Sequence, residues 1–235
     1  MKTMKLRKMS TQNSISANYR ALAQEVLKKA RADHKIYIEA VTKTRTAKEV
    51  NQAIKAGAII IAENKVQEAA GKITKVIKGP LTRTHLIGHL QSNKTKKAIS
   101  IFDTIETVDS LKILKKIDTV AREQNKTQEI YLQVNIGGDP NKYGLEPERA
   151  LEIIGIIKDY NNVNLTGLMT ILPLGLSKKS TRDMYLEMQK LYSKSQEIRS
   201  KIINLSMGMS NDYQIAIECG ASHVRIGTAI FGPRA

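Results

Sequence analysis

Lys43 is the residue whose position suggests chemistry most directly. It ends the segment 36–43, whose apolar and β-branched residues are typical of a buried strand. Two later segments of the same kind, 204–210 and 223–228, end in glycine and hydroxyl residues, which suit close contact with a phosphate. An amine facing a phosphate site is the arrangement that holds a phosphorylated aldehyde, because a neutral amine and an aldehyde form an imine. Burial and neighbouring cations, for which Arg45 and Arg225 are the candidates, would lower the pKa of that amine and favour its neutral form.

The candidate phosphate ligands lie near the C-terminus. Ser210 follows one strand-like segment, and Gly227 with Thr228 follow the next. Glycine lets backbone N–H groups come close to an anion, and hydroxyl groups donate hydrogen bonds to its oxygens. Such residues are common after strands in α/β proteins, so the prediction depends on Lys43 lying at the same end of the sheet.

Arg225 is the candidate partner of a bound aromatic ring. It alternates with His223 and Gly227, so strand geometry puts these three residues on one face. If that face is inward, the guanidinium can donate to a ring nitrogen. Because arginine does not readily release a proton, that nitrogen would stay largely unprotonated and the ring would be a weak electron sink. The alternative is a salt bridge at the edge of the core, with a partner such as Glu218.

Two further residues are candidates either for contact with a ligand or for a purely structural role. Asn64 follows the second strand-like segment and can contact the hydroxyl side of a bound ring, or it can cap the helix that follows. Met169 ends the sixth such segment and can pack on the face of the ring, or it can belong to the core.

The spacing of His85 and His89 does not predict a metal site. Two histidines four residues apart share a face only on a helix, and these two flank a strand-like segment. No cluster of carboxylates accompanies them in the adjacent sequence, so no metal ligand is predicted.

Eight strand-like segments alternate with helical patterns and must position these residues. The predicted strands are 37–42, 58–62, 85–88, 102–106, 130–135, 164–169, 204–207 and 223–227. The predicted helices are 47–56, 66–77, 110–124, 147–160 and 180–201, with N-caps at Thr46, Asp109 and Ser180 for three of them. This alternation predicts parallel pairing and closure into a (β/α)8 TIM barrel, with a doubly wound open sheet as the second choice.

The chain is predicted to form one domain. A length of 235 residues is typical of a single α/β barrel. The last predicted strand has no long helix after it, and the amphipathic segment 14–32 is expected to cover that part of the barrel as an extra N-terminal helix. We therefore predict a flexible basic N-terminus over 1–13 and a single cofactor-binding barrel domain over 14–235.

Composition narrows the classes of partner. The net charge of +16 would attract any polyanion, but the basic residues are dispersed and no aromatic platform for nucleic-acid bases accompanies them, which makes nucleic-acid binding the minority interpretation. No apolar stretch of membrane-spanning length and no secretory signal is found. Cys219 is the single cysteine, so no disulfide framework is predicted and the default location is the cytoplasm.

Several segments together resemble the pyridoxal phosphate (PLP) homeostasis protein family, whose fold is similar to the N-terminal barrel domain of alanine racemase. The resemblance runs from about residue 14 to the end and is carried by segments 40–44, 63–68, 85–94, 167–170, 205–210 and 224–232. It implies PLP as the cofactor, held as an internal aldimine on Lys43. It also implies phosphate contacts from Ser210, Gly227 and Thr228, a ring-nitrogen contact from Arg225, and pocket lining by Asn64 and Met169.

Two departures from the family pattern stand out. Glu39 occupies a position that is usually apolar, and by strand alternation it shares a face with Lys43. Ala62 replaces an expected glycine before Glu63 and Asn64.

Three functions follow as expectations. The first is a non-catalytic PLP carrier in vitamin B6 homeostasis, a monomer that can pass the cofactor to PLP-dependent apo-enzymes. The second is an amino-acid racemase, for which Tyr143 or His89 would have to supply the second acid or base. The third is a basic RNA-binding or scaffold protein, with salt-sensitive affinity for RNA.

Overall fold

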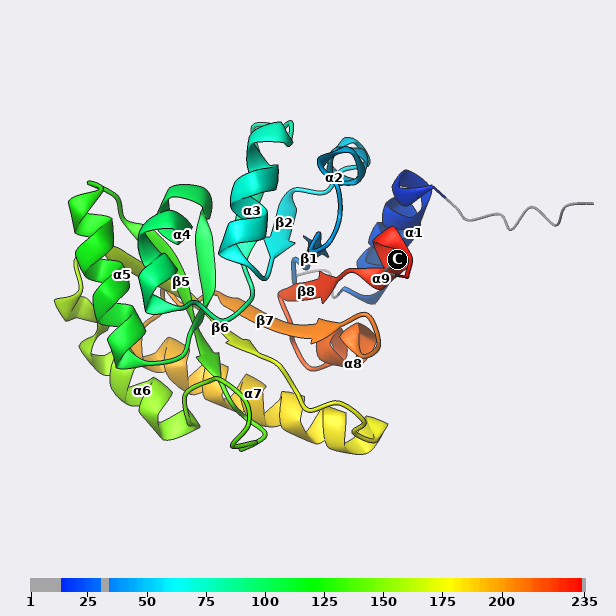
Figure 1. The fold of residues 1–235 in the computed structure, drawn as a ribbon. Helices are drawn as coiled ribbons and strands as arrows, with labels where there is room; N and C mark the ends of the chain where they lie inside the picture. The colour runs from blue at the N-terminus through cyan, green and yellow to red at the C-terminus, as the bar shows by residue number, and fades with distance from the viewer. Residues whose placement is uncertain (1–13, 31–33, 234–235) are drawn as a thin grey trace, which may run out of the picture.

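The computed structural model describes residues 14–30 and 34–233, which form a closed barrel of eight parallel strands surrounded by helices (Figure 1). The strands are β1 (Tyr37–Val41), β2 (Ile60–Glu63), β3 (Arg83–Leu86), β4 (Thr104–Val108), β5 (Gln128–Val134), β6 (Val163–Thr170), β7 (Asn204–Met209) and β8 (His223–Ile226). Each strand pairs in parallel with the next, and β1 also pairs in parallel with β8. The predicted barrel is confirmed, and the open sheet is excluded.

A helix follows each of the eight strands, and one more precedes β1 in the described part of the chain. They are α1 (Ile15–Lys29), α2 (Ala47–Lys55), α3 (Val66–Lys72), α4 (Thr95–Ile101), α5 (Leu111–Glu123), α6 (Pro147–Ile156), α7 (Lys178–Ile198), α8 (Tyr213–Glu218) and α9 (Thr228–Phe231). Short 3-10 turns extend α3 and α6 and precede α4. The helices α4 and α8 were not predicted. Among the described residues, no helix has the length and hydropathy needed to cross a membrane.

Helix α1 covers the junction where the barrel closes. It packs against α2, α8 and α9, and Figure 1 shows it in blue beside the red α9. Three of its side chains are buried: Tyr19, Leu22 and Val26. Because α9 has four residues, α1 takes the place of a long eighth outer helix, as predicted. The predicted flexible segment over 1–13 lies outside the described residues.

The helix starts were predicted with mixed success. Thr46 caps α2 in a reciprocal capping box with Glu49. The predicted N-caps Asp109 and Ser180 were wrong, because Ser110 caps α5 and Ser177 caps α7.

The core has two parts of different character. Between the barrel and its helices it is built of aliphatic side chains, as the composition predicts. The inside of the barrel instead contains a group of buried polar and aromatic side chains that contact one another across the strands. These are Glu39, His85, Glu106, Tyr131, His223 and Arg225. The composition gave no sign of this polar interior.

Candidate functional site

A cavity of about 730 Å³ opens at the carboxyl ends of the strands, the end at which barrel proteins place their active sites. Six of the seven residues predicted to bind a cofactor line it. They are Lys43, Asn64, Ser210, Arg225, Gly227 and Thr228. The fold thus brings together residues that are spread over most of the chain. What each does toward a ligand stays a prediction.

Lys43 lies in a tight turn just after β1. The Arg45 N–H donates to the Thr42 carbonyl at 3.0 Å, and Thr44 has the left-handed φ of 63°. The Lys43 side chain is half-buried and lines the cavity. The Arg45 guanidinium donates instead to the Gly232 carbonyl at 2.6 Å. Of the two arginines considered as neighbours of the lysine, it is Arg225 that lines the cavity.

Arg225 is held firmly in the interior of the barrel, with 4% of its surface exposed. Its guanidinium donates to the Ser206 hydroxyl at 2.7 Å and to the Thr170 carbonyl at 2.6 Å. The alternative salt bridge with Glu218 is not formed, because Glu218 pairs with Arg182 on the surface. The fixed guanidinium therefore gives the cavity a permanent positive charge.

The turn after β7 presents Ser210. The Met209 N–H donates to the Asp212 carboxylate at 2.6 Å, and the Asp212 N–H returns to the Met209 carbonyl at 3.0 Å. This turn needs Gly208, which has a φ of 93° and whose added Cβ would lie 2.5 Å from the Cβ of Ala216. Glycine at this position therefore lets the chain bring Ser210 to the cavity.

Gly227, by contrast, is not required by its own surroundings. Its φ is −114°, and an added Cβ would lie 3.5 Å from the nearest protein atoms, which belong to Val41. Neither backbone conformation nor packing in the protein excludes a side chain here. A ligand that approaches the backbone from the cavity would account for the glycine.

Asn64 supplies an unsatisfied polar atom to the same cavity. Within the described part of the chain, its buried Oδ1 has no hydrogen-bond partner. It does not cap α3, since the N-cap position is Lys65 and no side-chain cap bond forms there. An added Cβ on Gly88 would lie 2.1 Å from the Asn64 carbonyl oxygen, so only glycine fits beside this loop. A buried acceptor without a partner is a place where a ligand donor is expected.

Met169 is fully buried in β6, next to Gln133 of β5 and Ser206 of β7 in the register of the sheet. It is not among the described residues that line the cavity. Its contact with a bound ring stays a prediction.

A histidine and a carboxylate form a pair on the cavity wall. His89 Nδ1 lies 2.8 Å from Asp109 Oδ2, and the His89 ring stacks on Tyr143 with centroids 3.7 Å apart. His89 and Tyr143 both line the cavity. The sequence pointed to these two residues but not to Asp109, which was predicted only as a helix cap. Pairing across 20 residues leaves no periodic signal in a sequence.

Glu39 lies inside the barrel, as its alternation with Lys43 predicts. Burial, together with the charge of nearby Glu106, raises the pKa of Glu39 well above its ordinary value. Burial also opposes charge on Glu106, but the hydrogen bonds with His85 and Glu39 and the nearby histidines together outweigh it and lower the pKa of Glu106. Two carboxyl groups in one buried site thus divide into a neutral and a charged partner.

The reason given for excluding a metal at His85 needs correction. His85 does lie beside carboxylates, because Glu39, His85 and Glu106 offer ligand atoms within 4.8 Å of one another. The 2.6 Å contact between His85 Nδ1 and Glu106 Oε1 is, however, a hydrogen bond, and because the lowered pKa keeps Glu106 charged, the imidazole N–H is assigned as its donor. A protonated Nδ1 cannot coordinate a metal, but Nε2 of the same ring is buried without a hydrogen-bond partner among the described residues, so the absence of a metal here stays a prediction.

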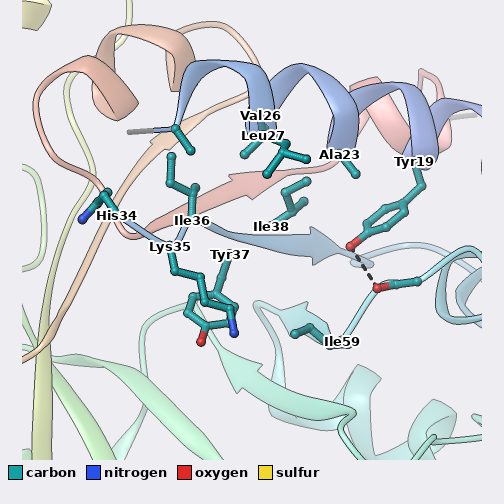
Figure 2. A pocket seen from close by; sticks show the side chains of 12 residues that line it. Tyr19, Ala23, Val26, Leu27, His34, Lys35, Ile36, Tyr37, Ile38 and Ile59 are labelled. Atoms are coloured by element: carbon teal, nitrogen blue, oxygen red, sulfur yellow. Dashed lines mark hydrogen bonds between the residues drawn. The ribbon is translucent and has the colours of Figure 1, made fainter. Parts of the chain in front are cut away.

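A second cavity, of about 590 Å³, lies between α1 and β1 (Figure 2). Its walls are mostly apolar and include Val26, Leu27 and Ile38, and the Tyr19 hydroxyl donates to the Gly57 carbonyl at 3.3 Å along its edge. Ala30 and His34 on its rim flank residues 31–33, which lie outside the described part of the chain. No function is assigned to it.

The family model of the alanine racemase N-terminal domain matches residues 11–235, which include the whole barrel and its cavity. Alanine racemase from Clostridium difficile superimposes with a TM-score of 0.77 at 16% identity, over 93% of this chain and 57% of that one, which supports the fold alone.

Closer relatives define the family. The pyridoxal phosphate homeostasis protein of Synechocystis is 38% identical over 85% of this chain and 92% of its own length. That of Pongo abelii is 36% identical over 83% of this chain and 75% of its own length. PipY of Synechococcus elongatus with PLP bound superimposes with a TM-score of 0.82 at 30% identity, over 93% of this chain and 100% of PipY. The chain belongs to the pyridoxal phosphate homeostasis protein family.

Proposed function

We propose that this protein binds PLP in the cavity at the carboxyl ends of the strands and serves in the homeostasis of that cofactor. The observation that carries the proposal is that a lysine amine, a buried arginine and the turns bearing Ser210 and Gly227 line one cavity. Relatives of similar length carry the homeostasis name, and PipY has been solved with PLP bound.

The residues present fit the cofactor. Asn64 offers an acceptor that the described protein leaves without a partner, and Gly227 leaves room for a group close to the backbone. When bound, PLP supplies an aldehyde that reacts with an amine and a phosphate that needs hydrogen-bond donors. Lys43 is the amine in this proposal, and Ser210 and Thr228 donate to the phosphate.

Arg225 favours a holding role over chemistry that needs a strong electron sink, but it does not distinguish that role from a racemase-like one, whose arginine contact would be similar. It donates two hydrogen bonds to the protein and keeps its protons, so it faces a ring nitrogen as a donor without protonating it. An unprotonated ring withdraws electrons weakly, which disfavours chemistry at the carbon atoms of a bound amino acid. Reversible attachment to Lys43 then limits the free aldehyde. Transfer to apo-enzymes, the monomeric state and the cytoplasmic location stay predictions.

A second candidate function is weak racemase-like activity, and the pair His89 and Asp109 favours it. An imidazole oriented by a carboxylate is a common acid or base, and this one faces the cavity that contains Lys43. Exchange of the Cα proton of an amino acid with deuterated water, lost in His89→Asn, would identify it. Binding to RNA would instead appear as affinity that falls steeply with salt.

The test of the main proposal is the absorption spectrum of the protein with added PLP, before and after borohydride, followed by peptide mapping. We expect a visible band that borohydride removes, with the label on Lys43. Lys43→Ala should lose the band, whereas Lys48→Ala, an exposed lysine of α2, should keep it. A label that persists in Lys43→Ala at another lysine would overturn the assignment, and no band at all would overturn PLP binding.

A further inference from the structure

Lys72 is a buried lysine that lies outside the cavity and takes no part in the proposed binding of PLP. Only 9% of its side chain is exposed, and it comes from the last turn of α3. Its ammonium lies 2.7 Å from Glu63 Oε1, 3.0 Å from Glu68 Oε1 and 2.7 Å from the Thr42 carbonyl oxygen. Three acceptors match the three protons of a lysine ammonium. We call Glu63, Glu68 and Lys72 the carboxylate-lysine clamp.

The clamp forms hydrogen bonds with Thr42, the residue before Lys43. Besides the bond from Lys72 to its carbonyl, Thr42 donates its hydroxyl to Glu63 Oε1 at 2.5 Å. The Thr42 N–H donates to the Ala62 carbonyl of β2 at 2.9 Å. Thr42 is fully buried, so every one of these polar groups is satisfied away from water.

The clamp also accepts a hydrogen bond from Thr44, the residue after Lys43. The Thr44 N–H donates to Glu68 Oε1 at 2.5 Å, and the same oxygen accepts from Lys72. Thr44 has a φ of 63°, a left-handed conformation that costs a β-branched residue free energy. A carboxylate that accepts the Thr44 N–H offsets this cost and fixes the turn in the form that directs Lys43 to the cavity.

We propose that the carboxylate-lysine clamp positions the amine of Lys43 for covalent capture of PLP. It is a set of positioning residues, because its members act through the backbone on both sides of Lys43. The alternative is that the clamp only attaches α3 to the barrel. Burial raises the pKa of Glu63, against the hydrogen bonds from Lys72 and Thr42, so loss of the lysine would leave an acid there that is readily protonated. The inference rests on the proposed binding of PLP.

The test compares covalent capture with non-covalent binding. Lys72→Met removes the ammonium and keeps the aliphatic chain, and Lys75→Met is the matched control on an exposed lysine three residues later. A misplacement of about 1 Å can cost about a hundredfold in rate, so we expect Lys72→Met to slow borohydride-trapped labelling of Lys43 by PLP by about tenfold to a hundredfold. Affinity for pyridoxamine phosphate, which has no aldehyde, should stay within about twofold of wild type, and Lys75→Met should match wild type in both assays.

A second variant guards against failure of Lys72→Met to fold. Glu68→Ala removes the acceptor of the Thr44 N–H at a side chain that is 29% exposed, and it should slow labelling in the same way. Labelling at the wild-type rate in both variants would overturn the inference. An equal loss of pyridoxamine phosphate affinity would also overturn it, because it would mean that the whole cavity had lost its shape. A slower rate that recovers at high pH would overturn it too, because it would mean that the substitution acts through the charge state of Lys43. Absence of a label and of affinity in the wild type would overturn the proposed function itself.

Discussion

His223 gives the sharpest prediction about stability. It lies inside the barrel with 4% of its surface exposed, between the Tyr37 ring at 4.9 Å, the Tyr131 ring at 5.9 Å and the His85 ring at 6.2 Å, measured between centroids. Burial lowers the pKa of His223 from 6.5 to about 3, and the charge of Glu106 opposes this without overcoming it. The folded protein therefore keeps this imidazole neutral in mildly acidic solution.

The consequence is a loss of stability as the pH falls below 6.5, since the unfolded chain takes up a proton there and the folded chain does not. At pH 5 the solution is 1.5 pH units below the ordinary pKa of 6.5 and still above the folded value of about 3. At about 1.36 kcal/mol per unit, the unfolded state gains about 2 kcal/mol relative to the folded state from this group alone.

The assay is urea unfolding of the wild type and of His223→Asn at pH 7.5 and pH 5. The void left by the smaller side chain costs the same at both pH values, so it cancels in the difference between them. We expect the wild type to lose about 2 kcal/mol more than the variant on going to pH 5. Equal losses, or a His223 ring signal that titrates near pH 6.5 by NMR, would refute the reasoning.

Two further substitutions test the surroundings of the cavity and the barrel interior. Gly88→Ala would place a Cβ 2.1 Å from the Asn64 carbonyl oxygen. We therefore expect a loss of about 1–3 kcal/mol in the free energy of unfolding, measured in urea, and weaker binding of PLP, measured by titration. Unchanged stability would contradict the contact. Glu39→Gln should stabilise the protein relative to wild type by an amount that grows as the pH rises above about 4.3, because the raised pKa keeps the folded carboxyl protonated while the unfolded one ionises. Unfolding at pH 4 and pH 7 measures this, and an advantage that does not grow with pH would contradict it.

Local sequence patterns predicted the long elements well and the short ones poorly. The segment 110–124 alternates apolar and charged residues with a helical period and corresponds to α5, because thirteen residues carry enough repeats to define a face. The helices α4 and α8, of seven and six residues, were missed, since they span less than two full turns of such a pattern. Their formation depends on packing against the barrel more than on propensity.

The helix N-caps show the same difference between features with a local sequence signal and features without one. Thr46 was identified because its partner Glu49 is three residues away and both halves of the capping box are visible in the sequence. At the start of α5 two adjacent residues, Asp109 and Ser110, are both good caps. Ser110 is the N-cap of α5, whereas the Asp109 carboxylate pairs with His89 on the cavity wall.

The sequence by itself determined the order of strands and helices and the place of Lys43, Ser210 and Gly227 after strands, because strand and turn signals are local. It also determined that Glu39 shares a face with Lys43, since strand alternation is fixed by the backbone. Only the tertiary structure decided the register in which β1 pairs with β8, with Glu39 beside Arg225. The same is true of Lys72 beside Thr42 and of His89 beside Asp109, 30 and 20 residues apart, because contacts of that kind follow from strand register and helix packing, which leave no pattern in the chain itself.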